Sequence, residues 1–559
     1  MYVVVIGTAG NQRYIFSSRK RQEIVGASDL IAQVNGSWAD EAMARVFPGF
    51  DRSWRIKDGH AAELITAGAG AITVLVRDKD AGRSLVTELT GRALREAPGL
   101  DVCGVVVEAV GPLAHDISAA RTELAAVRES RPGPQARFLR LPLVEDCAST
   151  GLPAMSLHRE GRDEPSRTRS AASMAKLDHF QHALSRLAED AQTDVATTRK
   201  IVDRLGLEAD WVAVVHADGN GFGDIFRGLG DRLDVADAVN RDGKYTEALR
   251  TLSLGVDDCA KRAFHKALTR TAAEHASVTV NGMPPVLPLV LGGDDLTVLC
   301  EGAVALPFAR HYLEAFEEET ASDALLRPIL DKADRPWLGA AAGVAIVKRN
   351  YPFRFAYDLA EELITAEAKQ VKAWGSALAF TVLFESSAPD LARIRSSSTL
   401  AGGTVASASP YLVGRGSDDP RAERRRWSDL LRRVDALQRT DAESGELLIP
   451  SGAVHELREG LCLGAEVADA RFTLLRTRFS GSPARLAALA ELEGDPGRLV
   501  WRDHSDHAAH ADHADHGDLV NHIDRSDHID RGGHEERMVT GLMDAVAALP
   551  FLPIRGAAG

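Results

Sequence analysis

The chain has 559 residues, an apolar content of 45% and a formal net charge of −14. This length allows three or four domains with substantial cores, and the acidic balance argues against a phosphate-tracking surface over the whole protein. Five scattered cysteines are typical of a reducing compartment rather than a disulfide scaffold. No apolar run approaches the roughly 20 residues of a membrane span, and Met1–Ile6 lacks the basic start of a signal peptide. We therefore expect a cytoplasmic protein without membrane contact.

The first 110 residues are predicted to form one α+β domain. Strands and helices alternate in the order βαββαβ, which is the ferredoxin-like arrangement. The predicted elements are the strand Tyr2–Ile6, the mostly helical Gln22–Val46, the hairpin of Ala62–Ala67 and Ala71–Arg77, the helix Ala81–Glu96 and the strand Asp101–Val107. The next segment, 111–206, is predicted to be a helical linker around a small insert at Cys147.

The hairpin tip of this first domain, Thr66–Gly70, has glycines but no carboxylates. We therefore expect no metal in this domain. Glycine still permits a nucleotide to approach closely, and the candidate nucleotide contacts are Ser17, Ser28, Gly68 and Gly70. The alternative is a duplicated scaffold that holds no ligand.

Residues 207–385 are predicted to repeat the same order of elements. The repeat begins with a buried strand and a glycine-rich turn, and it ends with a helix that carries Lys369. The predicted elements are the strand Trp211–Val215, the helix Tyr245–Thr271, the hairpin of Val286–Val290 and Leu296–Leu299, the helix Ala305–Thr320, the strand Leu338–Val347 and the helix Phe355–Trp374. The sequence thus predicts a second ferredoxin-like domain.

Three carboxylates stand at two strand ends of this second domain. Asp218 follows the first strand, and Asp294 and Asp295 follow two glycines at the hairpin tip. Carboxylates are hard oxygen ligands that suit Mg²⁺ or Mn²⁺ on a nucleoside triphosphate. Two-metal phosphoryl transfer needs such ligands to converge from separate places. The alternatives are an ordinary solvated turn for the hairpin and a helix cap for Asp218.

Nucleotide-binding candidates surround these carboxylates. Backbone N–H groups of a glycine-rich turn can hold phosphates, and a lysine can reach a triphosphate as a point charge. The alternative for the lysine is a solvated helix face. The candidates are Gly219, Asn220, Gly221, Phe222, Gly223, Gly292, Gly293 and Lys369.

The remainder of the chain is predicted to be a linker and a helical C-terminal domain. Residues 386–420 are rich in Ser, Gly, Ala and Pro, and residues 421–559 have the apolar periodicity of a helical bundle. The basic cluster Arg421–Arg426 with Arg432-Arg433 favours a solvated helix face over an RNA or partner contact. An Asp/His-rich tract, 503–537, is predicted to be a disordered insertion, with adventitious metal binding as the alternative.

Residues 1–380 resemble the CRISPR polymerase family, the large, palm-domain subunit of type III CRISPR effectors. Tyr14–Ser18 with Gly26–Leu30 resembles the opening of the family's first palm, and His216–Gly223 with Gly292–Asp295 resembles its second palm. Cys147–Ala154 resembles the family's zinc-binding insert, but the chain has no CxxC pair. A structural zinc site needs four N or S ligands, so we expect no zinc. The family's histidine–aspartate nuclease domain is not recognised, which suggests a shortened form.

The resemblance implies two palms that face each other with two ATP molecules, and two Mg²⁺ or Mn²⁺ ions on Asp218, Asp294 and Asp295. It implies a nucleotidyltransferase that joins ATP units, with release of pyrophosphate, into a cyclic oligoadenylate signal in antiviral defence. A diguanylate-type cyclase using GTP and a non-catalytic nucleotide-binding scaffold of an RNA-guided complex stay open as alternatives. RNA, CRISPR-type proteins and a second copy of the chain are candidate partners.

Overall fold

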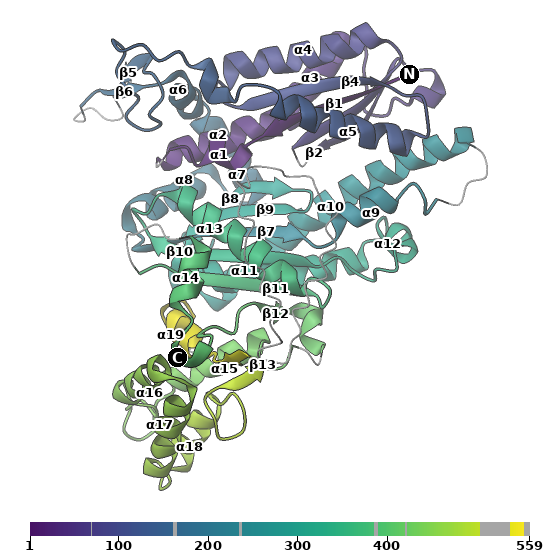
Figure 1. The fold of residues 1–559 in the computed structure, drawn as a ribbon. Coiled ribbons are helices and arrows are strands. Elements are labelled where there is room, and N and C mark those ends of the chain that lie inside the picture. The colour runs from purple at the N-terminus through teal and green to yellow at the C-terminus, as the bar shows by residue number, and fades with distance from the viewer. Residues whose placement is uncertain are drawn as a thin grey trace.

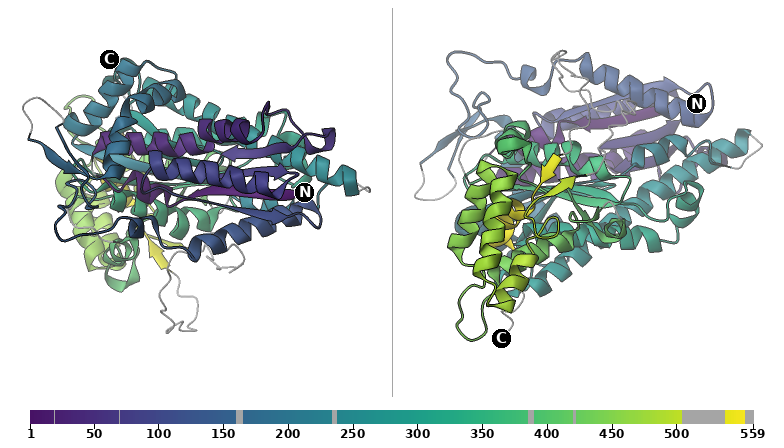
Figure 2. Two further views of the ribbon diagram at one scale, coloured as in Figure 1. Left: turned by 90° about the horizontal axis from the view of Figure 1, so that it is seen from above. Right: turned by 60° about the horizontal axis from the view of Figure 1, so that its bottom comes forward.

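Two α+β domains lie one above the other, and the C-terminal helices lie on the side of the second domain away from the first (Figures 1 and 2). The structure is a computed structural model, and it describes residues 1–18, 20–68, 70–159, 165–233, 238–384, 390–419, 422–503 and 537–552. Both domains have mainly antiparallel sheets covered by helices. The predicted α+β fold class is confirmed.

The first domain has a four-stranded antiparallel sheet in the order β2-β3-β1-β4. This order, with helices between β1 and β2 and between β3 and β4, is that of a ferredoxin-like fold. Its elements are β1 (Tyr2–Ala9), α1 (Asn11–Ile15), α2 (Arg21–Asn35), α3 (Ser37–Val46), β2 (Ala62–Gly68), β3 (Ala71–Val76), α4 (Lys79–Glu96) and β4 (Asp101–Glu108).

The strand β1 is apolar throughout because both of its faces are covered. Val4 and Ile6 lie in the core beneath α2 and α4, whereas Val3 and Val5 lie in the core beneath α5 (Leu113–Glu129). A strand buried on both faces does not alternate between apolar and polar residues. The sequence therefore gives a strong strand signal here, without the alternation of a half-exposed strand.

The second domain repeats this arrangement and extends it. Its sheet has the order β12-β11-β10-β7-β9-β8, so the last four strands again form the ferredoxin-like set, and β11 is added parallel to β10. The elements are β7 (Trp211–Gly219), α9 (Phe222–Gly228), α10 (Ala238–Glu274), β8 (Val286–Gly292), β9 (Asp295–Glu301), α11 (Gly302–Ser322), α12 (Arg327–Lys332), β10 (Ala340–Lys348), α13 (Phe353–Ala366), β11 (Ser376–Val382) and β12 (Tyr411–Val413).

The two domains contact each other through equivalent elements. The helix α2 of the first domain lies against β8 of the second, and α10 of the second lies against β2 of the first. Ser28 Oγ on α2 donates to Leu289 O, 2.5 Å away. On the other side, Arg250 Nη2 on α10 donates to Leu64 O at 3.2 Å. The pair is thus held in a pseudo-twofold arrangement in which each domain braces the other's hairpin.

Two predictions about the end of the second domain are wrong. The helix predicted over Phe355–Trp374 ends at Ala366, because Glu367 leaves the helical region (φ −127, ψ −66), and Lys369 lies on the separate 3-10 turn η5 (Ala368–Val371). Part of the predicted linker 386–420 belongs to this domain, since β12 pairs with β11. The composition of that segment did not show that three apolar residues complete a sheet.

The segment 111–206 joins the two domains mainly through helices, as predicted. Its insert contains the short hairpin of β5 and β6. The elements are α5, β5 (Ser156–His158), β6 (Arg167–Arg169), α6 (Ala171–Asp178), α7 (Phe180–Asp190) and α8 (Val195–Asp203). Cys147 is buried, and its Sγ lies 3.4 Å from Ser149 Oγ. Removal from water raises the pKa of this thiol, but hydrogen bonds from Ser149 and Thr150 outweigh that effect and lower the pKa to about 6.

The C-terminal domain is mainly helical, with α14 (Leu391–Ser397) before it and one added hairpin. Its helices are α15 (Trp427–Gln438), α16 (Ser451–Leu463), α17 (Ala465–Arg478), α18 (Pro483–Ala490) and α19 (Leu542–Ala548), and the hairpin is β13 (Trp501–Asp503) with β14 (Arg537–Val539). The Asp/His-rich tract, residues 504–536, lies outside the described residues, and its flanking residues Asp503 and Arg537 are partners in this hairpin. None of the described helices combines the length and apolar character needed to cross a bilayer.

The prediction of a solvated helix face for the basic cluster of this domain holds for part of the cluster. Arg432 is exposed on α15, Arg421 lies outside the described residues, and the other arginines make internal contacts. Arg433 is 2% exposed and lies over the Trp501 ring, and Arg425 is 5% exposed and paired with Asp503 at 2.5 Å. Arg424 pairs with Asp495 at 2.9 Å. These arginines tie β13 and the loop before it to α15, so their charges serve internal contacts.

Candidate active site

Three carboxylates come together at one corner of the second sheet. Ala217 of β7 pairs with Leu296 of β9, and Gly292 of β8 pairs with Asp295. Continuing the antiparallel register places Asp218 opposite Asp295, close enough for Asp218 to contribute to the raised pKa of Asp295. A Cβ built on Gly219 would lie 2.8 Å from Asp294 Cβ. Asp218, Asp294 and Asp295 therefore converge from the end of β7 and the tip of the β8–β9 hairpin.

The hairpin tip is shaped by glycine and held from beneath by α10. Gly293 has a φ of 62°, a conformation that favours glycine in a two-residue turn. Its N–H donates to Asp257 Oδ1 at 3.0 Å, and Asp257 is paired with Lys261 at 2.6 Å. Asp257 was not among the sequence candidates, because nothing in the helical pattern of α10 distinguishes it from a surface acid.

The corner carries strong local repulsion between like charges. Removal from water and the nearby Asp218 carboxylate raise the pKa of Asp294 to about 6. Removal from water, followed by Asp294 and Asp218, raises the pKa of Asp295 well above its ordinary value. Such crowding disfavours the ionised forms unless a cation is near. Lys369 supplies one cation, since its Nζ forms an ion pair with Asp218 Oδ2.

The donor chemistry of the corner fits a hard divalent cation. Three carboxylates offer oxygen ligands only, which Mg²⁺ and Mn²⁺ prefer, and a cation would relieve the repulsion that raises the two pKa values. Within the described residues, no group of three or more His, Cys, Asp or Glu side chains is arranged to hold a metal as it stands. Asp218 Oδ2 instead faces the ammonium group of Lys369.

The predicted phosphate turn has two kinds of residue: glycines that leave the backbone uncovered, and two residues whose side chains are buried. Gly221 has a φ of 73° and, with Gly219 and Gly223, leaves the turn without side chains beyond Cα at three positions. Asn220 is 4% exposed; its N–H donates to Gly339 O and its side chain to Gly375 O. Phe222 is also 4% exposed and packs near Phe316. The side chains of Asn220 and Phe222 therefore hold the turn in place from inside the protein.

The first domain has the same hairpin register without the carboxylates. In both hairpins the pairing shifts by one residue at the same place, after Leu64 in β2 and after Pro288 in β8, and Gly68 pairs with Ala71 as Gly292 pairs with Asp295. The position of Asp295 is thus taken by Ala71, that of Asp294 by Gly70 and that of Asp218 by Gly7, which pairs with Ala71.

A cation takes the place of the missing carboxylates in the first domain. Arg128 Nη2 on α5 donates to Thr8 O at 2.9 Å and lies directly against Gly7, where a Cβ would overlap it. Thr8 N in turn donates to Gly70 O at 2.9 Å. Sequence reasoning missed Arg128, because no motif links a helix after β4 to the end of β1.

A cavity of about 470 Å³ opens beside this corner of the first domain. Ser17 lines it together with Gly10, Arg13, Tyr14 and Lys176, and further walls come from the insert at Gly133–Phe138. Ser17 Oγ donates to Tyr14 O and accepts from the buried Lys176 Nζ at 2.7 Å. Of the predicted contacts in this domain, Ser17 lines the cavity, whereas Gly70 O accepts a hydrogen bond from Thr8 N near the end of β1.

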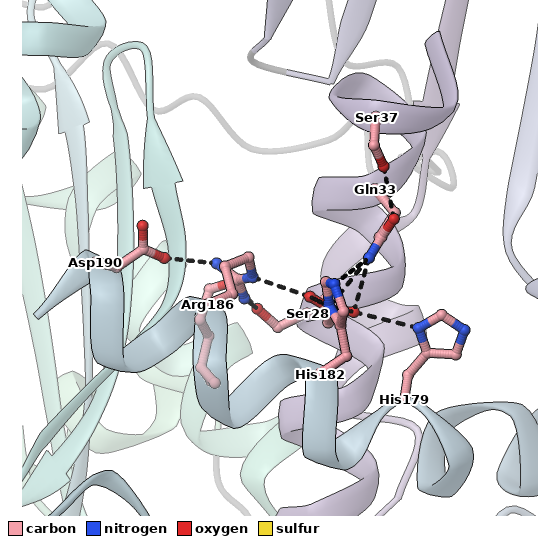
Figure 3. Close-up of polar contacts among 9 residues, drawn as sticks. Ser28, Gln33, Ser37, His179, His182, Arg186 and Asp190 are labelled. Atoms are coloured by element: carbon pink, nitrogen blue, oxygen red, sulfur yellow. Dashed lines mark hydrogen bonds and ion pairs between the residues drawn. The ribbon is translucent and has the colours of Figure 1, made fainter. Parts of the chain in front are cut away.

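Ser28 does not face this cavity, which corrects its prediction as a nucleotide contact. It is 2% exposed, and its hydroxyl donates to Leu289 O and accepts from Arg186 Nη2 at 2.7 Å. Figure 3 shows the network that continues from it. Asp29, which is fully buried, contacts His179, the N-cap of α7, at 3.2 Å, and His182 and Arg186 of α7 at 2.9 and 3.2 Å. Ser28 therefore joins α2, α7 and the β8 strand of the second domain.

Comparisons with known proteins agree with the second domain. Residues 211–376 match the sequence model described as Cas10/Cmr2, second palm domain. A search of curated protein sequences gave no match. Similar solved structures include a Csm1–Csm4 cassette in complex with cA4, with 12% identity and a TM-score of 0.47. That match covers 88% of this chain and 65% of the solved chain. The same cassette with pppApApA (12%, 0.47, covering 88% and 64%) and a type III-B Cmr-beta complex in the apo state (12%, 0.36, covering 65% and 67%) are also similar.

The chain spans less than two thirds of the length of the Csm1 chains that it matches. The matched family segment begins with β7 and ends at the first residue of β11, so it includes all three converging carboxylates. The predicted resemblance of His216–Gly223 and Gly292–Asp295 to the second palm is confirmed. Residues 211–376 of this chain are a second palm domain of the Cas10/Cmr2 family.

Proposed function

We propose that this protein is a metal-dependent nucleotidyltransferase that joins ATP units into a cyclic oligoadenylate in antiviral defence. The observation that carries the proposal is the convergence of Asp218, Asp294 and Asp295 at one corner of the second palm. The family match of residues 211–376 supports it, because the match includes this corner. The residues do not specify the base; adenine follows from the family resemblance.

Asp218, Asp294 and Asp295 would hold the divalent cations. Bound Mg²⁺ or Mn²⁺ supplies a lowered pKa for the attacking ribose hydroxyl and neutralises charge on the α-phosphate and the leaving pyrophosphate. Lys369 would exchange Asp218 for the triphosphate, which it can reach as a mobile point charge. Asp257 would keep the hairpin tip fixed through Gly293 N–H, so that the two carboxylates of the tip keep their positions.

The transfer step is the same for each unit that is added. The ribose hydroxyl oxygen of one nucleotide forms a bond to the α-phosphorus of the other, and the hydroxyl proton passes to water. The bond between that phosphorus and the bridging oxygen breaks, and pyrophosphate leaves. The glycine turn Gly219–Gly223 would lie along the phosphates, and its missing side chains allow close approach.

The first palm would hold the partner nucleotide without a metal. Gly7, Gly70 and Ala71 replace all three carboxylates, whereas Arg128 and the cavity beside Ser17 and Lys176 remain. Cationic side chains and a cavity of about 470 Å³ suit a nucleotide phosphate and part of its nucleoside. The second palm then does the chemistry, and the first positions the other reactant.

Mass spectrometry of products tests this function. Protein is incubated with ATP or with GTP in the presence of Mn²⁺, with and without RNA, and compared with Asp294→Ala/Asp295→Ala. We expect cyclic oligoadenylates and pyrophosphate from ATP and none from the variant. Cyclic products from GTP alone would favour the diguanylate-type reaction. Equal inertness of both proteins toward all four triphosphates, with unchanged nucleotide binding, would favour the non-catalytic scaffold.

A further inference from the structure

Arg335 lies on the loop between α12 and β10, and its guanidinium covers the predicted phosphate turn. A Cβ built on Gly221 would lie 3.2 Å from Arg335 Nη2, 3.4 Å from Nη1 and 3.5 Å from Cζ. The three distances are nearly equal, so the guanidinium is laid broadside against this glycine. Any larger residue at 221 would displace it, and the φ of 73° already favours glycine there.

The guanidinium of Arg335 has no carboxylate partner in the part of the chain that the structure describes. Two nearby arginines, which are more exposed, do have one: Arg227 pairs with Asp224 at 2.7 Å, and Arg327 pairs with Asp331 at 3.0 Å. An arginine has five N–H donors and keeps its charge at every physiological pH. Arg335 therefore brings an uncompensated cation to the edge of an otherwise acidic corner.

The loop that carries Arg335 is held firmly in place. Arg335 N donates to Leu330 O at 3.0 Å, and the preceding Asp334 has a left-handed φ of 53°, which is uncommon for a residue other than glycine. Two residues later, Arg415 Cζ lies over the Trp337 ring, 5.0 Å from the ring centre, in a cation–π contact. The backbone N–H of Arg415 donates to Glu317 Oε2 at 2.8 Å. The contact between the guanidinium and Gly221 therefore comes from a loop that is fixed in position.

The position of Arg335 relative to the carboxylates suits a polyphosphate. Gly221 is two residues beyond Gly219, which abuts Asp294. A triphosphate whose α-phosphate lies at the carboxylates would run along the turn toward Gly221. There it would meet a planar guanidinium, which can bind phosphate oxygens through two parallel hydrogen bonds.

We propose that Arg335 binds the terminal phosphates of the triphosphate in the second palm, and the released pyrophosphate after transfer. The inference rests on the proposed function for the identity of the substrate, but not for the existence of the phosphate site. Its ligand class is an inorganic or nucleoside polyphosphate. Arg335 and Lys369 would then grip the polyphosphate from two sides, with the glycine turn between them.

Binding of inorganic tripolyphosphate tests this inference without any catalytic step. The full chain, Arg335→Gln, Arg335→Lys and the control Arg327→Gln are titrated by calorimetry with tripolyphosphate and with AMP, each with Mg²⁺. Arg327 is a matched control because it is exposed, lies on α12 before the same loop, and has a guanidinium that contacts Asp331 and Ala321 O. We expect Arg335→Gln to weaken tripolyphosphate binding by about 10-fold to 100-fold, the range of a charge-assisted hydrogen bond.

The other proteins sharpen the result. Arg335→Lys should recover part of the lost affinity because it keeps the charge, whereas AMP affinity should be the same in all four proteins. Equal tripolyphosphate affinity in wild type and Arg335→Gln would overturn the inference, as would an equal loss in Arg327→Gln. So would a wild-type protein that binds no tripolyphosphate.

The proposed function fails by a different result. If tripolyphosphate binding depends on Arg335 and yet no triphosphate yields a product, the phosphate site stands and the nucleotidyltransferase does not. If products form from ATP and Arg335→Gln leaves both tripolyphosphate affinity and the KM for ATP unchanged, the function stands and the role of Arg335 does not.

Discussion

The two palms have one backbone plan and opposite charge at its working corner. Both have the strand order of a ferredoxin-like fold, and both hairpins shift register at the same residue. In the second palm the corner holds three carboxylates and a lysine; in the first it holds Gly7, Gly70, Ala71 and Arg128. The comparison shows that one backbone arrangement can carry opposite charge, because three side chains decide the charge of its corner.

The difference also appears beneath the two hairpin tips. A Cβ on Gly68 of the first palm would meet open space, whereas a Cβ on Gly292 would lie 3.1 Å from Asp257 Oδ1. Asp257 holds the second tip through Gly293 N–H. The hairpin tip that carries two carboxylates is thus held by Asp257, whereas the tip without carboxylates has open space at the equivalent glycine.

The largest expected effect comes from making the second palm like the first. Asp294→Ala with Asp295→Ala should lower product formation by a factor on the order of 10³ or more, because metal-assisted charge stabilisation is worth several kcal/mol. The melting temperature should hold or rise, since the repulsion that raises both pKa values disappears. Product yield and thermal unfolding, measured in parallel, check both. A variant that unfolds at lower temperature and keeps its activity would contradict the assignment.

The next effect separates the two hairpin tips. Gly292→Ala should lower activity by about tenfold, because the added methyl group pushes Asp257 and shifts the tip by a few tenths of an ångström. Gly68→Ala, at the equivalent position of the first palm, should leave activity within about twofold, since nothing lies within 4 Å of the new atom. Steady-state rates of pyrophosphate release give the answer. Equal effects of the two substitutions would show that the tips are not specialised.

The contact between the palms should show itself as stability rather than chemistry. Ser28→Ala removes the donor to Leu289 O and the acceptor of Arg186, and it should destabilise the protein by about 1–2 kcal/mol. Ser37→Ala is the control, because Ser37 is exposed and its partner is Gln33 on the same side of the domain; it should change stability by less than about 0.5 kcal/mol. Urea unfolding measures both, and a loss of nucleotide affinity in Ser28→Ala without loss of stability would return Ser28 to the binding site.

The smallest effect is an acid sensitivity of the second palm. A hydrogen bond from His311, with Arg310 nearby, lowers the pKa of Glu274 to about 2. A carboxyl group with a depressed pKa in the folded state stabilises above its ordinary value, and this contribution is lost as the pH falls from about 5 toward 2. Because Glu274 is 45% exposed, solvent screening keeps the contribution below about 1 kcal/mol. Glu274→Gln should flatten the melting temperature over this pH range, and a parallel curve for the variant would refute the assignment.

The sequence by itself determined the two palms, the position of the carboxylates and the absence of carboxylates from Thr66–Gly70. These features are local. Apolar runs indicate the strands, glycine pairs indicate the turns, and two adjacent acids at a turn can be recognised without knowing what packs against them. Ser17 is also a local feature, because it belongs to a short segment of the chain that lines the cavity of the first domain.

The tertiary structure alone decided which side chains line the cavity or the corner, which are buried, and which brace the hairpin tip. Ser28, Asn220 and Phe222 look like ligand contacts in the sequence, but they are buried because other elements pack on them. Arg128, Asp257 and Arg335 look like surface residues of helices and loops, yet each reaches the end of a strand distant in the sequence. Direction of a side chain depends on long-range packing, and no local pattern of residues encodes it.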